Sequence, residues 1–166
     1  GIAAFRSLRV AGDAMDEEIQ DYFRRAYNIS IGLKTAEQVK KKLGCVFAPV
    51  ATDETVLVKG KDLMEGIPVS RKISQHELTK VLERPFKQIE ECIHQSLEVC
   101  PPELSSDIYQ SGIYVTGGNA QLKGVKERFS KIFKLQVNID PEALLSVSKG
   151  IGKILTDPQK HKAVLI

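Results

Sequence analysis

The sequence predicts an α/β fold in which a smaller α+β subdomain interrupts a larger one. Three observations support this prediction. A strand and a helix open the chain, alternating strands stand between helices in its middle, and a strand–glycine turn–helix unit spans residues 112–133. This order of elements is what an insertion into an α/β unit produces. A cleft between two such subdomains is a common place for a ligand site.

The composition is that of an ordinary globular protein. The 166 residues are 42% hydrophobic and 27% charged, enough for one domain or two small ones. The net charge of +3 is too small to indicate nucleic-acid binding. The three cysteines have no metal-ligand spacing and are expected to be reduced thiols, so the sequence nominates no metal site. No apolar run approaches membrane-spanning length.

The first two elements are predicted to be a strand and a helix. Residues 1–10 alternate so that one face carries Ala4, Arg6, Leu8 and Val10. Asp13 is interpreted as the N-cap of a helix that runs to about Asn28. Helical spacing gives this helix an apolar stripe made of Met15, Ile19, Tyr22, Phe23 and Ala26.

A second helix is predicted from Thr35, whose spacing to Gln38 fits a capping box, to a stop at Gly44. Glu37 and Lys40 lie three residues apart and therefore share one face of this helix. A carboxylate can accept hydrogen bonds from a ribose diol, and a lysine stem can lie along a base. The alternative is a surface ion pair of little consequence. A solvated helix face is the expected role of the basic run that begins at Lys40.

The middle of the chain predicts a small antiparallel sheet followed by a long helical stretch. Gly60 is expected to break one strand, and Pro68 indicates an edge strand. The spacing of Ser74 and Glu77 fits a capping box, and Pro85 is expected to kink the helix that follows or to begin a new one. The predicted strands cover residues 45–51, 54–59 and 67–73.

The last third is organised around a glycine turn. The apolar strand 113–115 leads to Gly117 and Gly118, and an amphipathic helix follows. Glycines allow positive φ and the close approach of a ligand, and the N–H groups at a helix start suit an anion. Most turns of this kind are only connections. A strand over 135–139 and a final helix after residues 140–141 complete the prediction.

The final helix contains two glycines, Gly150 and Gly152. Each glycine costs a helix roughly 1 kcal/mol relative to alanine. Their presence therefore indicates a close approach of the helix backbone to another element or to a ligand.

Several segments taken together resemble one family, MreB, the bacterial actin. Residues 6–16 (RSLRVAGDAMD) resemble the segment after the family's second phosphate loop, and residues 31–40 (IGLKTAEQVK) resemble the helix that contacts adenosine. The resemblance keeps the family's order from about Arg6 to Leu155. Further matching segments are 58–63, 100–104 and the Thr-Gly-Gly of 116–118 with Ala120 and Leu122.

The resemblance implies the second half of an actin-like fold, with an RNase H-like sheet. Residues 1–26 and 96–166 are then expected to form the larger subdomain, and residues 27–95 the smaller inserted one. The family's two phosphate loops, catalytic acidic residues and membrane anchor would belong to a first half that precedes this chain. The complete family protein would be an ATPase, while this chain alone is expected to be inactive.

The resemblance also carries nucleotide contacts onto this sequence, with ATP as the implied ligand and Mg²⁺ beside it in the complete protein. The adenosine-contacting stretch corresponds to Glu37, Gln38, Val39 and Lys40. The last nucleotide loop corresponds to Gly117, Gly118, Asn119 and Ala120. Asn119 stands where the family usually has a third glycine. Asparagine tolerates positive φ better than most residues, and its side chain could crowd or hydrogen-bond the phosphates.

The function implied is that of a cytoskeletal protein. It would polymerise into membrane-associated filaments in the cytoplasm, at the inner face of the bacterial membrane, and maintain cell shape by guiding peptidoglycan synthesis. The implied partners are further copies of itself and cell-shape or wall-synthesis membrane proteins such as RodZ, with membrane contact only through the first half. Two alternatives stay open: a phosphotransferase of the same superfold, for which the sequence nominates no substrate-binding acid, and a degenerate, non-hydrolysing partner-binding module.

Overall fold

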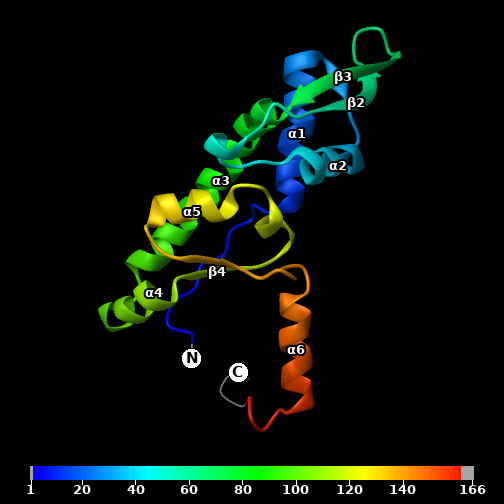
Figure 1. Ribbon diagram of the computed structural model, residues 1–166. Helices are drawn as coiled ribbons and strands as arrows, with labels where there is room; N and C mark the ends of the chain where they lie inside the picture. The colour runs from blue at the N-terminus through cyan, green and yellow to red at the C-terminus, as the bar shows by residue number, and fades with distance from the viewer. Residues whose placement is uncertain (1, 162–166) are drawn as a thin grey trace.

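Two small sheets and one long helix, α3, organise the chain (Figure 1). The computed structural model describes residues 2–161. In chain order, with η for a 3-10 helix, the elements are α1 (Gly12–Tyr27), β1 (Ile29–Ser30), α2 (Leu33–Leu43), η1 (Ala48–Val50), β2 (Thr55–Asp62), β3 (Pro68–Ser74), α3 (Gln75–Glu98), η2 (Pro102–Leu104), α4 (Ser105–Ser111), β4 (Ile113–Val115), η3 (Gly118–Gln121), α5 (Val125–Phe133), β5 (Val137–Ile139) and α6 (Ser146–Thr156).

Helix α1 forms because its apolar residues recur at helical spacing. Met15, Ile19 and Phe23 are fully buried, as the stripe predicts, whereas Ala26 is exposed. The expected N-cap is wrong: the helix starts one residue before Asp13 and its N-cap has no side-chain hydrogen bond. Asn28 ends the helix in the left-handed conformation, with φ of 54°. Asparagine is among the few residues that adopt this conformation at low cost.

The larger of the two sheets is antiparallel, with the strand order β1-β2-β3. The prediction that Gly60 breaks a strand is wrong, because β2 continues through it to Asp62. A Cβ at this glycine would lie 2.6 Å from the carbonyl oxygen of Ser30, so its absence lets β1 pair beside β2. The sequence interpretation missed β1. Pro68 begins β3, which is an edge strand as predicted.

Two predicted strands are not strands in the structure. Residues 2–10 pair with no strand among the described residues, and Gly1 lies outside them. An extended segment needs a neighbour to satisfy its N–H and C=O groups before it becomes part of a sheet. Residues 45–51 contain one isolated bridge, between Cys45 and Lys123, and then the 3-10 helix η1. Pro49 favours this outcome, because its backbone has no N–H to give to a ladder.

Helix α3 begins as the sequence predicts and forms the long helical stretch expected there. Ser74 and Glu77 form a complete capping box at its N-terminus. Pro85 neither ends the helix nor begins a new one, and α3 continues to Glu98. At 1.5 Å per residue, these 24 residues reach about 36 Å. Figure 1 shows that α3 therefore extends from the β2–β3 hairpin to α4.

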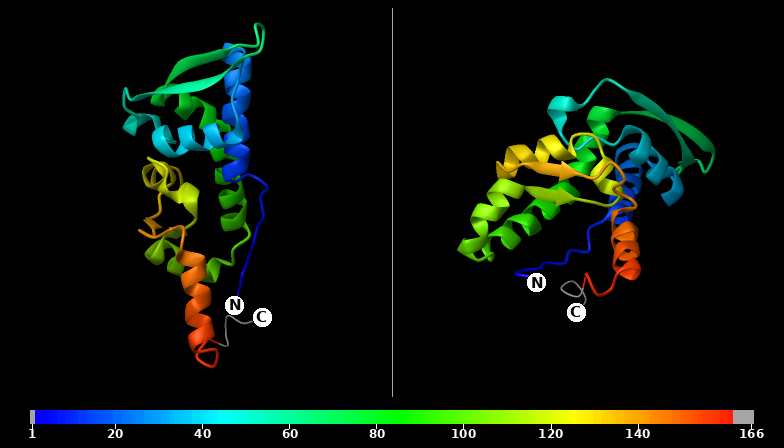
Figure 2. Two further views of the ribbon diagram at one scale, coloured as in Figure 1. Left: turned by 90° about the vertical axis from the view of Figure 1, so that its right-hand side faces the viewer. Right: turned by 60° about the horizontal axis from the view of Figure 1, so that its bottom comes forward.

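The C-terminal third contains the second sheet and two helices. Strands β4 and β5 are parallel, and α5 lies between them in the chain. The final helix begins at Ser146 and not directly after Pro141. Gly150 and Gly152 have no neighbour within 4 Å of a Cβ built on them, so the expected close approach is not found among residues 2–161. Figure 2 shows α6 projecting from the other elements.

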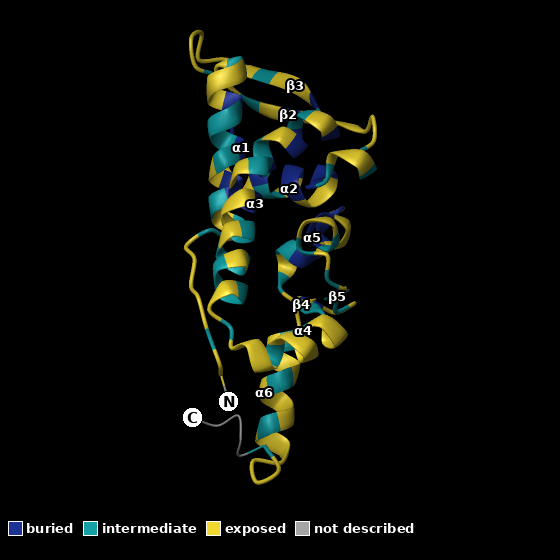
Figure 3. Ribbon diagram, turned by 90° about the vertical axis from the view of Figure 1, so that its left-hand side faces the viewer, coloured by how far each residue is buried: buried dark blue, intermediate teal, exposed yellow. Residues whose placement is uncertain are grey.

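The buried side chains form one core that passes from the larger sheet to the smaller one. Figure 3 shows that buried positions gather on α1, α2, α3 and α5, whereas α6 has none. The rings of Phe86 on α3 and Phe129 on α5 lie 6.1 Å apart and connect the two regions. The division into residues 1–26 with 96–166 and residues 27–95 stays a prediction, and residues 1 and 162–166 lie outside the described part.

Candidate functional site

A hollow of about 680 Å³ lies where the start of α1, the middle of α2 and the glycine turn before α5 come together. This volume is within the range typical of small-molecule sites. The hollow is lined by Gly12, Asp13, Asp16, Glu37, Lys40, Lys41, Gly118, Asn119, Gln121, Leu122 and Leu144.

The hollow contains half of the eight residues that the resemblance assigns to nucleotide binding. Those lining it are Glu37, Lys40, Gly118 and Asn119. Segments that are about 80 residues apart in the sequence thus share one surface. Gln38 and Val39 line a different hollow, between α2 and β2, because a helix turns neighbouring residues to different sides. Ala120 is buried, and Gly117 lies at the edge of the turn.

Lys40 is buried at the floor of the hollow, with only 5% of its surface exposed. Its Nζ donates hydrogen bonds to the carbonyl oxygen of Gly12 at 2.8 Å and to Oδ2 of Asp16 at 3.0 Å. The expectation that the basic run is a solvated face is therefore wrong for Lys40, although Lys41 and Lys42 are exposed. A buried ammonium needs such partners to offset the loss of water.

Asp16 is the buried partner of Lys40. Its Oδ1 lies 2.9 Å from Lys40 Nζ but outside hydrogen-bond geometry, so this atom accepts no hydrogen bond from the part of the chain that the structure describes. Burial raises the pKa of the Asp16 carboxyl above its ordinary value, and Lys40 opposes this shift. Sequence analysis assigned Asp16 no role in the site. Its position three residues before Ile19, on the buried side of α1, was the available signal.

Glu37 does not pair with Lys40, with which it shares a helix face. Its Oε1 lies 2.6 Å from the ammonium of Lys41, one turn further along α2. The hydrogen bond from Lys41 lowers the pKa of Glu37, which therefore stays ionised at neutral pH. The side chain is 43% exposed and lies at the rim of the hollow. It can still accept hydrogen bonds from a ligand's hydroxyl groups.

The glycine turn forms the opposite wall. Gly117 has a φ of +87°, a conformation that favours glycine, and no atom lies within 4 Å of a Cβ built there. Its N–H donates to the carbonyl oxygen of Ala143 at 2.9 Å, which ties the turn to the segment before α6. Asn119 does not have positive φ. It belongs to the 3-10 helix η3, so this replacement of a glycine causes no backbone strain.

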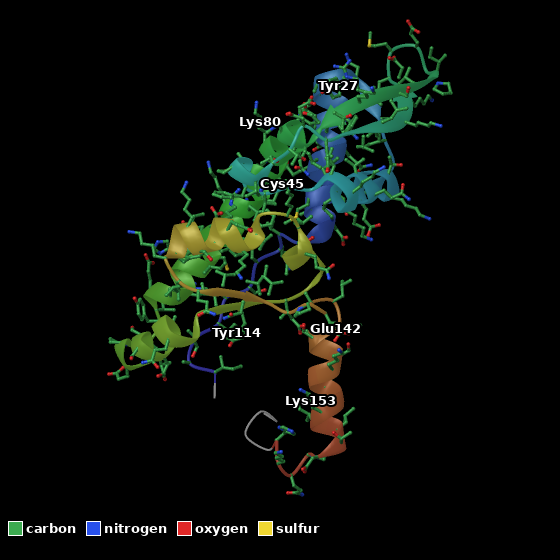
Figure 4. All side chains as sticks on the ribbon, in the orientation of Figure 1. Tyr27, Cys45, Lys80, Tyr114, Glu142 and Lys153 are labelled. Atoms are coloured by element: carbon green, nitrogen blue, oxygen red, sulfur yellow. The ribbon has the colours of Figure 1, made fainter. Side chains whose placement is uncertain are left out.

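Two further observations bear on the kind of site. Within residues 2–161, no group of three or more His, Cys, Asp and Glu side chains is placed to hold a metal ion. None of the described helices combines the length and apolar character needed to cross a membrane. The cysteines are free, as expected, and Cys45 lies buried where the chain leaves α2 (Figure 4).

The sequence is similar to that of one protein family. The family described as MreB/Mbl protein matches residues 1–163. The chain is 34% identical to the cell shape-determining protein Mbl of Bacillus subtilis over 159 residues, which are 96% of this chain and 47% of that protein. It is also 34% identical to the cell shape-determining protein MreB of Escherichia coli, over 97% of this chain and 46% of that protein. The chain thus spans about half the length of these relatives.

Solved structures show the same similarity. MreB5 of Spiroplasma citri bound to AMPPNP superposes with a TM-score of 0.92 at 35% identity, over 100% of this chain and 50% of that one. A more distant structure, the MamK double helical filament, has a TM-score of 0.64 at 21% identity, over 85% of this chain and 45% of that one, and shares the fold.

The fold, with its glycine turn facing a helix across a hollow, is therefore the α/β fold of actin-like proteins, as the sequence predicts. The match over nearly the whole chain narrows this class further. The chain belongs to the MreB/Mbl family of actin-like, cell shape-determining proteins.

Proposed function

We propose that this protein binds ATP in the hollow between α2 and the glycine turn, as part of a filament-forming cytoskeletal protein. The observation that carries the proposal is the convergence of Glu37 and Lys40 with Gly118 and Asn119 on one hollow. These residues come from the two separate segments that the family resemblance assigns to nucleotide contacts.

The charges around the hollow favour one orientation of the nucleotide. The end formed by α1 and α2 carries the carboxylates of Asp13, Asp16 and Glu37, of which Lys40 and Lys41 neutralise the last two, so one net negative charge remains. Carboxylates repel phosphate but accept hydrogen bonds from sugar hydroxyls. The adenosine therefore belongs at this end, and the phosphates belong beside the glycine turn, where no atom lies within 4 Å of a Cβ built on Gly117.

The bound ligand of a relative supports the choice of an adenine nucleotide. MreB5 of Spiroplasma citri was solved bound to AMPPNP, and this chain superposes on it over its full length. ATP would supply the phosphates for hydrolysis, while this chain would bind and orient its adenosine. Mg²⁺ in the complete protein is part of the proposal, but we assign it to no residue among 2–161.

The proposal includes the cellular role. Relatives named for determining cell shape, and an actin-like filament of the same fold, support self-association into filaments that guide wall synthesis. We place these filaments in the cytoplasm, at the inner face of the bacterial membrane. Cell-shape membrane proteins such as RodZ would be partners, as the family resemblance implies.

Nucleotide titration followed by electron microscopy tests the proposal. The full polypeptide that carries this sequence should bind ATP saturably in calorimetry and form filaments with ATP on grids. Exposed Lys126→Met, on α5 away from the hollow, is the control and should bind as the parent does. No saturable ATP binding would contradict the proposal and favour a degenerate partner-binding module. Binding without filaments, with phosphorylation of a small molecule, would favour a phosphotransferase.

A further inference from the structure

The ion pair of Asp16 and Lys40 joins two helices behind the candidate nucleotide site. Asp16 lies on the second turn of α1, Lys40 lies on α2, and both side chains are more than nine-tenths buried. A buried ion pair is weak evidence for a stabilising role, since a well-packed apolar pair often serves as well or better. Its place on the wall of the hollow suggests a role toward the ligand.

The Lys40 ammonium is only partly used by the protein. An ammonium has three N–H donors. Two of them serve the Gly12 carbonyl oxygen and Asp16 Oδ2. The remaining donor makes no hydrogen bond to the residues that the structure describes, and the nearby Oδ1 of Asp16, at 2.9 Å, lies outside hydrogen-bond geometry.

The Lys40 ammonium lies next to the position that a side chain on residue 12 would occupy. A Cβ built on Gly12 would lie 3.3 Å from Lys40 Nζ and 3.7 Å from the side-chain nitrogen of Asn119. The ammonium and the amide therefore flank the same small volume in front of Gly12, which only a glycine leaves unfilled. Because no side chain on residue 12 covers the ammonium, a ligand oxygen in the hollow that Gly12, Lys40 and Asn119 line could accept the third N–H of Lys40.

We propose that Asp16 is a positioning residue of the nucleotide site. Its carboxylate fixes the Lys40 ammonium so that one N–H points into the hollow and donates to a ribose oxygen of the bound nucleotide. The pair is also electrically neutral, so Lys40 recognises the sugar by a directed hydrogen bond and not by net charge. This inference rests on the proposed nucleotide binding.

The ratio of the affinity for ADP to the affinity for a deoxy-ADP measures this role. The full polypeptide should bind ADP about tenfold more tightly than 2′-deoxy-ADP or 3′-deoxy-ADP, because a hydrogen bond from a charged donor is lost with the hydroxyl. Asp16→Asn should lower this ratio by about threefold or more, because the ammonium is no longer fixed, while any contribution from Glu37 remains. A purely structural role would change the affinity for the three nucleotides alike and leave the ratio unchanged.

A double-mutant cycle shows whether Asp16 acts through Lys40. Lys40→Met should lower the ratio to the same extent, and Asp16→Asn should then change it no further. Glu17→Gln removes an exposed carboxylate from the same turn of α1 and should keep the parent ratio. If Asp16→Asn does not fold, Asp16→Glu displaces the carboxylate by one methylene and should lower the ratio.

The outcomes separate this inference from the proposed function. A parent that binds ADP but whose ratio survives Asp16→Asn or Asp16→Glu would overturn the positioning role alone. The positioning role would also be overturned if Asp16→Asn changed the ratio by the same factor in the parent and in the Lys40→Met variant. A parent that binds no ADP saturably would overturn the proposed function, and this inference with it.

Discussion

Arg128 on α5 donates a hydrogen bond from Nη1 to the main-chain carbonyl oxygen of Val46, at 2.7 Å. Val46 follows α2, and its own N–H donates to the carbonyl oxygen of Lys123 at 2.9 Å. The same guanidinium contacts the carboxylates of Glu83 and Glu90 on α3. Arg128 therefore holds the α2 side of the candidate site in place relative to the glycine-turn side, and it joins both sides to α3.

Replacing Arg128 with methionine should destabilise the fold strongly. The guanidinium is 6% exposed, and its removal leaves the half-buried Glu90 without its cation. Breaking such a pair from one side costs about 3 kcal/mol or more. Urea unfolding followed by circular dichroism measures the free energy of unfolding. Exposed Lys126→Met on the same helix should change it by less than about 0.5 kcal/mol, and equal effects of the two changes would contradict the prediction.

Glu77 should make stability depend on pH below neutrality. Burial raises the pKa of its carboxyl, but hydrogen bonds from Tyr27, Ser74 and Tyr22 outweigh burial and hold the pKa at about 2, below the ordinary 4.5. Because the pKa of Glu77 is lower in the folded protein than in the unfolded chain, its ionised carboxylate stabilises the fold at pH values above the unfolded pKa. This contribution is lost as the pH falls from about 5 to about 2.

Glu77→Gln tests this dependence. At pH 7 the variant should be less stable, by an amount on the order of 3 kcal/mol if the whole shift is lost. The difference should shrink as the pH falls toward 2, because the parent carboxyl then becomes neutral as well. Ser74→Ala removes the cap itself and should still lower stability at pH 3, by about 1 kcal/mol. A difference that does not change with pH would count against the assigned cause.

The capping box of Ser74 and Glu77 shows which features could be predicted from the sequence. Its partners are three residues apart, so spacing alone brings them together. The apolar stripe on α1 and the antiparallel β2–β3 pair likewise bring together residues that are close in the sequence. Lys40 and Asp16, by contrast, are 24 residues apart on different helices. No spacing rule joins them, and Lys40 therefore looked like one lysine of a solvated run.

The wrong strand predictions have a related cause. Alternation indicates an extended segment but does not supply its neighbour, and residues 2–10 find none in the described chain. Gly60 shows the opposite case. Strand β1 can pair beside β2 because Gly60 has no side chain, but β1 is only two residues long and therefore too short to be recognised by alternation. For the candidate site, the sequence indicated Glu37, Lys40, Gly118 and Asn119, but not Gly12 or Asp16.

Two glycine-to-alanine changes should have opposite signs. Gly112 has a φ of +74°, and a Cβ there would lie 2.2 Å from the carbonyl oxygen of Gln136. Gly112→Ala should therefore destabilise the β4–β5 pair by more than about 2 kcal/mol, because strain and a backbone clash add. Gly150 is in a helix with open space around its Cα. Gly150→Ala should increase the stability of α6 by about 1 kcal/mol.

Thermal unfolding measures the first change, and hydrogen exchange of the amides in α6 measures the second. Slower exchange in α6 is expected for Gly150→Ala, and Gly152→Ala offers a matched repeat in the same open surroundings. Faster exchange in both variants would mean that these glycines have a role that helix propensity does not explain.

Glu37 should contribute to nucleotide affinity even though Lys41 is its ion-pair partner. An ionised carboxylate at the rim can accept a hydrogen bond from a sugar hydroxyl, so Glu37→Ala should weaken ATP binding about tenfold. Calorimetry on the full polypeptide gives the dissociation constant. Glu127→Ala, at an exposed position on α5, should leave it unchanged. An unchanged constant for Glu37→Ala would reject its assignment as an adenosine contact.

Asn119 tests where the phosphates lie. Its side-chain amide is close to Gly12 and Lys40 across the hollow, and it has no hydrogen-bond partner among residues 2–161. Its N–H₂ group is thus available to a phosphate oxygen. Asn119→Asp keeps the shape but places a negative charge there, and we expect ATP affinity to fall at least about tenfold. Asn119→Gly loses one hydrogen bond to a charged oxygen but adds no repulsion, so it should weaken binding less than Asn119→Asp does.

Adenosine provides the internal control for Asn119, because it has the base and ribose of ATP but no phosphate. Its dissociation constant should change much less than that of ATP in Asn119→Asp and Asn119→Gly, because only ATP brings phosphate charge close to residue 119. If Asn119→Asp weakens adenosine as much as ATP, the asparagine contacts the nucleoside and the orientation proposed above is reversed. If neither ligand responds to the charge, Asn119 lies away from the bound nucleotide, and the glycine turn contacts it through Gly117 and Gly118 alone.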